Sequence, residues 1–414
     1  MTLAAGSFRR DARVIGLVGS AHFMSHFYLL CLPPLFPLLK GELGVNYVAL
    51  GLAMTTFNVA SGLTQVPTGF LVDRLGPRKI LLLGIVVEAM AFTAIGVFGT
   101  YEALIACMLV AGVANSAYHP ADYAILSASI GGERMGRAFS LHTFAGFAGN
   151  AVAPIVMVTL TALWDWRIAL MLTGGLGVVV AIGMVLNGSA LGDRVQVRGP
   201  ASAPPAGPPA RDRLVETPPQ DGLKLLFSAP VLMCFLFFVM LSMSSGGINA
   251  FAVSALVTLY DTPLSMANMA LTAFLACSAL GILAGGIIAD RTAKHEQVAS
   301  VGFATTAVII ALIGSIALPA LGIVLLLGLG GLLWGTIMPS RDMLVRAVTP
   351  AGATGKVFGF VSTGLNIGSA ITPAIFGWIL DQGDPRWLFW LAAIFMVLAL
   401  GTVFATKAVG RASA

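Results

Sequence analysis

The sequence predicts an all-α membrane protein with twelve transmembrane helices in two pseudo-symmetric six-helix bundles. The 414-residue chain is 57% hydrophobic, with a mean hydropathy of +0.92, whereas soluble domains are about 45–50% apolar. Apolar runs of about 20 residues recur along the whole chain, and each is long enough to cross a hydrocarbon core of roughly 30 Å. The two halves also resemble each other at a constant offset, which indicates a duplication.

The apolar runs form two sets of six. In the first half we expect helices at 14–39, 47–73, 79–99, 102–128, 136–162 and 167–188. In the second half we expect them at 225–259, 265–290, 298–319, 321–347, 355–380 and 386–407.

The first run follows a basic start, as a signal peptide does. It is too long for one and has no small-residue cleavage site, so we interpret it as a membrane span. Pro33, Pro34 and Pro37 should bend its outer end.

Residues 190–222 separate the two sets. They contain seven prolines and eight charged residues and almost no large apolar side chains, a composition that cannot bury a core. The predicted organisation is therefore an N-terminal bundle at 1–189, a cytoplasmic Pro-rich linker at 190–222 and a C-terminal bundle at 223–414.

The basic residues predict the orientation. Of the 23 Lys and Arg, only Lys40, Arg167 and Arg386 fall on the side opposite to the termini. Because basic residues crowd cytoplasmic loops, we expect both termini and the linker to be cytoplasmic, in a multi-pass protein of the inner (plasma) membrane. The basic residues form short clusters between apolar runs, so the net charge of +5 does not indicate nucleic-acid binding.

The internal repeat carries a charged motif. A shift of 219 residues superposes Pro120 on Pro339 and the Asp165-x-Arg167 loop on the one at 384–386. A shift of 217 residues superposes GFLVDR at 69–74 on GIIADR at 286–291. Both copies follow an even-numbered span on the predicted cytoplasmic side, and parallel repeats of this kind place a substrate site between the halves near the midplane.

With two times six helices, a basic linker and GFLVDRLGPRK at 69–79, the chain resembles the major facilitator superfamily. The resemblance implies that Asp73 latches the halves at the start of the eleventh helix, and Asp290 at the start of the fifth, since a carboxylate is stabilised at a helix N-terminus. The alternative is that these charges only fix orientation. The implied cytoplasmic gate consists of Gly69, Asp73, Arg74, Gly76, Arg78, Lys79, Asp290 and Arg291.

Ionisable side chains inside spans are costly and therefore mark candidate functional positions. The resemblance places helices 1, 4, 7 and 10 around a central cavity. The predicted substrate and proton pathway consists of His22, His26, His119, Asp122, Arg341, Asn150, Asn249 and Asn366. Glu88, His142 and Asp342 also lie within spans, without an assigned role. The structural alternative is that these groups are satisfied by neighbouring helices.

Two pairs in this set share helix faces. His22 and His26 are spaced i, i+4, and His119 and Asp122 are spaced i, i+3. The shift of 219 maps Asp122 onto Arg341, and we expect these two to pair across the cavity floor when its cytoplasmic side closes. Protonation of Asp122 would then trigger the change, and structural pairing without a transport role is the alternative.

Glycine-rich segments occur in three spans. GFAGNAVAP at 146–154 and LNIGSAITP at 365–373 predict close helix packing through Gly149 and Gly368. In helix 7, Gly246 and Gly247 predict either a break that exposes backbone groups or close packing.

AHFMSHFYLLCLPPLFPLL at 21–39 and the segment beginning SAYHPADY at 116 are similar to fosmidomycin-resistance-type transporters. This resemblance implies a proton-coupled transporter of a small polar or anionic compound, including drug efflux, that acts as a monomer without a cofactor. The alternatives are proton-coupled uptake of an organic acid, a metal carrier using His22, His26, His119 and Asp122, and a sensor without flux. The sequence contains no HExxH, GxSxG or P-loop motif, each of which would have indicated an enzyme.

Overall fold

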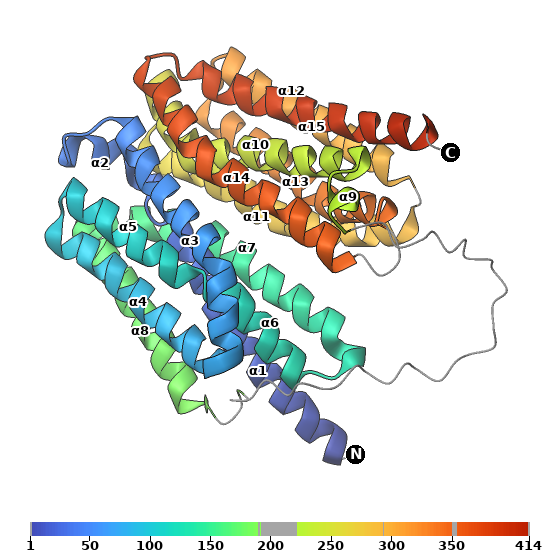
Figure 1. Ribbon diagram of the computed structural model, residues 1–414. Helices are drawn as coiled ribbons and strands as arrows, with labels where there is room; N and C mark the ends of the chain where they lie inside the picture. The colour runs from blue at the N-terminus through green and yellow to red at the C-terminus, as the bar shows by residue number, and fades with distance from the viewer. Residues whose placement is uncertain (1, 189–190, 192–221, 293, 350–353, 413–414) are drawn as a thin grey trace.

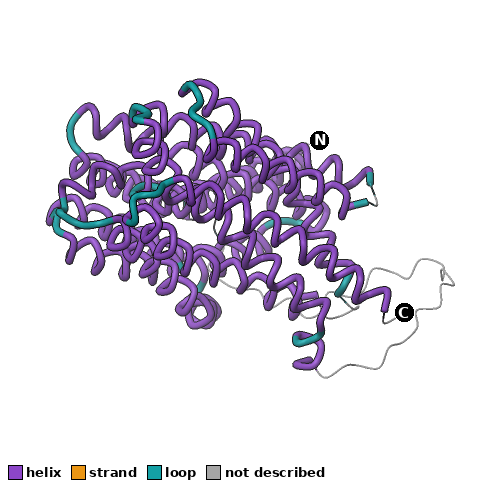
Figure 2. The backbone as a smooth tube through the Cα atoms, turned by 90° about the horizontal axis from the view of Figure 1, so that it is seen from above, coloured by secondary structure: helices purple, strands orange, loops and turns teal. Residues whose placement is uncertain are grey.

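The computed structural model describes residues 2–188, 191, 222–292, 294–349 and 354–412. Within these ranges the chain contains helices and loops but no strand (Figure 2). The first half comprises α1 (Thr2–Leu29), η1 (Pro33–Leu35), α2 (Phe36–Glu42), α3 (Tyr47–Leu75), α4 (Pro77–Phe98), α5 (Tyr101–Asn115), α6 (Tyr118–Ser129), α7 (Gly132–Leu163) and α8 (Trp166–Leu186). The second half comprises α9 (Gly222–Leu226), α10 (Ala229–Tyr260), α11 (Leu264–Arg291), α12 (His295–Ser315), α13 (Ala320–Ala347), α14 (Thr354–Asp381) and α15 (Arg386–Ala412).

These helices confirm the predicted membrane fold. Eleven segments in the described ranges are long and apolar enough to cross a bilayer, with α1 to α2 forming one of them and α5 with α6 another. The twelfth span is α3, which has 29 residues but is more polar because Asn58, Ser61 and Gln65 line an internal cavity. Of the predicted linker, only Leu191 and Gly222 lie inside the described residues.

Two spans are interrupted where proline removes a backbone donor. The first predicted helix, 14–39, ends instead at Leu29 and continues through η1 into α2, so its prolines break the helix and do more than bend it. The fourth predicted helix, 102–128, is divided between Asn115 and Tyr118, because Pro120 has no N–H to offer the carbonyl four residues earlier.

The glycine-rich segments pack closely against neighbouring helices, as predicted for Gly149 and Gly368. A Cβ atom on Gly149 would collide with the backbone of Phe23 in α1, and one on Gly368 would lie 2.5 Å from the Cβ atom of Ser242 in α10. The break considered for helix 7 is wrong, because α10 is continuous and Gly247 faces the ring of Phe376.

Gly149→Ala is expected to lower the midpoint of thermal unfolding of the purified protein. The added methyl group has no room beside Phe23, and overpacking typically costs about 1–3 kcal/mol. Gly175→Ala is the matched control, because a Cβ atom there meets nothing within 4 Å. An equal response of the two variants would contradict close packing of α7 on α1.

The two bundles meet at the end of the molecule opposite to the termini and diverge toward the termini (Figure 1). At the closed end, Asp381 of α14 accepts hydrogen bonds from the backbone N–H groups of Tyr47 (2.9 Å) and Val48 (2.7 Å) at the start of α3. Asn58 of α3 donates to the carbonyl of Ser369 at 2.9 Å. Toward the termini, a pocket of about 480 Å³ lies between α7 and α11, with Pro339 of α13 in its wall. The structure is therefore open on the side of the termini.

Candidate functional site

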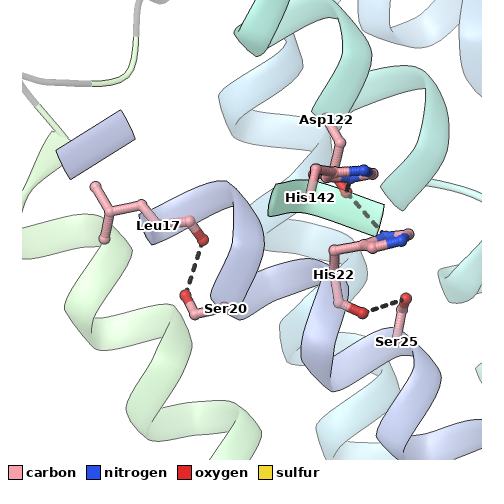
Figure 3. A network of polar contacts seen from close by, with 6 residues as sticks. All are labelled: Leu17, Ser20, His22, Ser25, Asp122 and His142. Carbon is pink, nitrogen blue, oxygen red and sulfur yellow. Dashed lines mark hydrogen bonds and ion pairs between the residues drawn. The ribbon is translucent and has the colours of Figure 1, made fainter. Parts of the chain in front are cut away.

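Four histidines from three helices gather beside one carboxylate. Figure 3 shows the two that approach Asp122 directly, His22 and His142. Nε2 of His142 on α7 lies 3.0 Å from Oδ2 of Asp122 on α6, and Nδ1 of His22 on α1 lies 3.5 Å from the same oxygen. The rings of His22 and His142 stack with their centroids 3.7 Å apart. The His22 centroid is 4.7 Å from that of His26 and 5.2 Å from that of His119. We call these five residues the His-Asp cluster.

The carboxylate of the cluster is shielded from solvent, and its close charged partners are imidazoles. Asp122 is completely buried, and no Lys or Arg side chain in the described ranges lies within 4.0 Å of it. Its Oδ1 atom has no hydrogen-bond partner, and neither has Nδ1 of His119. Because an uncompensated charge is costly inside a protein, a proton shared with the imidazoles is the natural counterion.

The helix packing creates room for the imidazoles. Gly146 of α7 faces α1, and a Cβ atom there would lie 2.7 Å from Nε2 of His22 and 2.9 Å from Cδ2 of His26. One turn further on, the side-chain amide of Asn150 lies 3.0 Å from Nδ1 of His26. His22, Asp122 and His142 place their nitrogen and oxygen atoms within 4.8 Å of one another, a spacing that a metal ion also accepts.

The cluster opens into a polar cavity of about 270 Å³ between the bundles. Its wall is formed by α1, α3, α5, α6 and α14. Three predicted pathway residues, His26, His119 and Asn366, line it, and Asn150 reaches it through His26. The remaining lining residues are Ser25, Leu29, Phe57, Asn58, Ser61, Gly62, Gln65, Asn115 and Ser369.

A second buried carboxyl group is linked to this cavity. Glu88 of α4 is completely buried, and its Oε1 accepts a hydrogen bond from the amide of Asn115 at 3.1 Å. Asn115 itself lines the cavity and accepts a hydrogen bond from Ser61 at 3.3 Å. The sequence marked Glu88 as an ionisable residue in a span, but its contact with Asn115 depends on how α4 packs against α5.

Two other predicted pathway residues lie outside the cavity wall. Arg341 of α13 pairs with the adjacent Asp342 at 2.8 Å and stacks over the ring of Phe238, 4.7 Å from its centroid. In this open conformation it does not pair with Asp122, so the expected pair remains a prediction for the closed state. Asn249 lies in α10, where its Oδ1 atom is buried without a hydrogen-bond partner.

The residues of the predicted gate lie at the open end. Gly76, with φ 95°, ends α3 and precedes α4, which begins at Pro77. Asp73, Arg74 and Lys79 are exposed. A Cβ atom on Gly69 would meet nothing within 4 Å, so no neighbouring helix packs closely on this position in the present conformation. The side chain of Asp290, which one of the predicted latches requires, lies outside the described part of the chain.

Two residues of this arrangement had no predicted role. His142 was recognisable as a histidine inside a span, but only the packing of α7 beside α6 brings it to Asp122. Asp381 sits at the C-terminus of its own helix, where the helix dipole disfavours an acid. That unfavourable position was the available signal that its partner belongs to another helix.

Known proteins share this fold and sequence pattern. A crystal structure of a bacterial homologue of the human lysosomal transporter Spinster, in an inward-facing and unoccupied conformation, superposes with a TM-score of 0.76 at 12% identity, covering 96% of this chain and 97% of that one. The fosmidomycin resistance protein of Escherichia coli (strain K12) is 21% identical over 287 residues, which are 69% of this chain and 67% of that protein.

The probable L-galactonate transporter of the same organism is 26% identical over 145 residues, which span 35% of this chain and only 32% of that relative. The model of the Major Facilitator Superfamily matches residues 18–262 and 235–412, essentially the whole described length. The chain therefore belongs to the Major Facilitator Superfamily of transporters.

Proposed function

We propose that this chain is a proton-coupled transporter that moves a small polar or anionic organic compound by alternating access. The observation that carries the proposal is a buried carboxylate, Asp122, embedded in imidazoles that reach the polar cavity between the bundles. Imidazole titrates near neutral pH and is suited to passing protons. We further propose that the chain acts as a monomer in the inner membrane with cytoplasmic termini, which makes the open conformation inward-facing.

The cavity suits a polar or anionic substrate. The side chains that line it include amides, hydroxyls and the imidazoles of His26 and His119, and no carboxylate occurs among them. A carboxylate or phosphonate group therefore meets donors without like-charge repulsion. Related proteins are named for fosmidomycin resistance and for probable galactarate/D-glucarate transport, and both names indicate polar, oxygen-rich compounds.

Proton binding and substrate binding would be coupled because both involve the same histidines. His26 and His119 line the cavity and also contact the ring of His22, which lies beside Asp122. A proton on the His-Asp cluster neutralises the carboxylate, and its loss leaves a buried charge whose cost changes the relative stability of the two conformations. Substrate in the cavity contacts the same imidazoles, so occupancy and protonation are linked.

Two latches at opposite ends of α3 and α14 would alternate. Asp381 at the C-terminus of α14 caps the start of α3 in the present conformation. Asp73, near the C-terminus of α3, is exposed here and is suited to cap the start of α14 once the open end closes. The rest of the proposed gate, including Arg74, Arg78, Lys79 and Arg291, would support that second latch.

Flux measurements in proteoliposomes test the function. Organic anions and antibiotics such as fosmidomycin are offered with and without an imposed pH gradient, and movement of the compound against its own gradient should require the pH gradient. Movement opposite to the protons indicates efflux by antiport, and movement with them indicates the alternative, uptake of an organic acid by symport. Flux that is unaffected by the gradient and by a protonophore would refute proton coupling.

A further inference from the structure

A second, apolar groove runs along the first bundle, away from the polar cavity. It has a volume of about 710 Å³ and lies between α1, α7 and α8. Along α1 it extends from Asp11 to Met24, about 20 Å at 1.5 Å per residue. One leaflet of a bilayer supplies about 15 Å of hydrocarbon. The groove is therefore long enough to hold a lipid acyl chain that spans one leaflet.

The groove is polar at one end only. Its body is lined by small and apolar residues such as Gly16, Gly19 and Leu176, with Ser20 as the polar exception. Its mouth, on the side of the termini, carries Asp11, Arg134 and Arg137.

The mouth retains a positive charge. Nη1 of Arg134 lies 2.9 Å from Oδ2 of Asp11, so this pair is neutral. Arg137 is exposed and forms no ion pair with the side chains that the structure describes. An apolar channel one leaflet deep that ends at an arginine is complementary to an anionic lipid.

The groove does not suit the proposed substrate. It contains none of the histidines or amides that line the central cavity. A polar compound would lose its hydration without gaining hydrogen bonds there. A hydrocarbon chain, in contrast, fills the space beside Gly16, where an added Cβ atom meets nothing within 4 Å.

We propose that this groove binds one acyl chain of an anionic phospholipid, with its phosphate at Arg137. The site belongs to the leaflet on the side of the termini, and it is independent of the substrate carried through the centre. A lipid held there packs against the faces of α1 and α7 next to those that carry His22 and His142.

Native mass spectrometry of the purified, delipidated full-length chain tests the site. Phosphatidylglycerol and phosphatidylcholine with identical acyl chains are titrated separately, and phosphatidylglycerol should bind with higher affinity. Arg137→Gln should weaken phosphatidylglycerol binding about fivefold, since one basic residue near a membrane surface contributes about 1 kcal/mol. Gly16→Leu, which fills the groove, should weaken binding of both lipids.

Matched controls distinguish this site from general lipid coating. Lys79→Gln removes a positive charge at the same end, and Gly183→Leu enlarges a glycine of α8 that also has nothing within 4 Å; neither residue lines the groove. Equal effects of Arg137→Gln and Lys79→Gln, equal affinity for the two lipids, or displacement of the lipid by inorganic phosphate would overturn the proposal. If Gly16→Leu fails to fold, the pair of charge variants decides the question.

Discussion

Asp122→Asn is expected to abolish proton-driven accumulation of substrate while substrate exchange continues. The amide is nearly isosteric with the protonated carboxyl group, so its oxygen still accepts a hydrogen bond from His142. It cannot release a proton, however, and the buried charge that links proton and substrate never forms. Accumulation driven by a pH gradient should fall at least tenfold, to the level of empty liposomes, with little change in counterflow of labelled against unlabelled substrate.

His295→Gln is the control for this measurement. It replaces the fifth histidine of the chain, at the start of α12, which lies outside the His-Asp cluster. Its accumulation and its counterflow should both equal those of the unaltered protein. Retention of gradient-driven accumulation by Asp122→Asn would exclude Asp122 as the coupling carboxylate, and loss of counterflow as well would assign it a structural role.

Asp381→Ala should shift the protein toward the conformation that is closed on the side of the termini. The carboxylate caps α3 across the boundary between the bundles, at 2.9 and 2.7 Å from two backbone N–H groups. These bonds exist only while the bundles meet at this end. Loss of a helix cap costs about 0.5–2 kcal/mol, so the ratio of the two conformations should change by about two- to thirtyfold.

The shift is measurable as a distance. Spin labels at Gly41 and Gln382, two exposed positions at the closed end, should report a larger population of long distances in Asp381→Ala. Asp165→Ala is the matched control, because Asp165 accepts two backbone hydrogen bonds of 2.7 and 2.8 Å within one bundle, at the start of α8. It should lower thermal stability without changing the label distances. Identical distance distributions for both variants would contradict the proposed role of Asp381 as a latch between the bundles.

Much of this fold was predictable because membrane spans follow from local composition. Hydrocarbon requires about 20 apolar residues per helix, so the number of spans and the duplication could be read from the chain. The i, i+4 spacing of His22 and His26 also predicted a shared helix face, and their ring centroids lie 4.7 Å apart.

The contacts between helices were not predictable in the same way. Each helix of a bundle has several partners, and a periodic pattern does not choose among them. His142 reaches Asp122 because α7 packs beside α6, and Gly146 leaves room between α7 and α1 for the rings of His22 and His26. Arg341 was expected at the cavity from the family resemblance and the repeat, yet in this conformation it forms an ion pair with its neighbour Asp342.

The duplicated halves have not kept the same chemistry. At the shift of 219 residues, the positions of His119, Asp122 and His142 correspond in the second half to Met338, Arg341 and Val361. Under the proposed function, the site of proton coupling therefore lies in the first bundle alone, and the second bundle has no equivalent of it at these positions. A chimaera that exchanged only the second bundle for that of a relative would therefore be expected to retain proton-driven transport, and it would keep all but Asn366 and Ser369 of the residues that line the polar cavity.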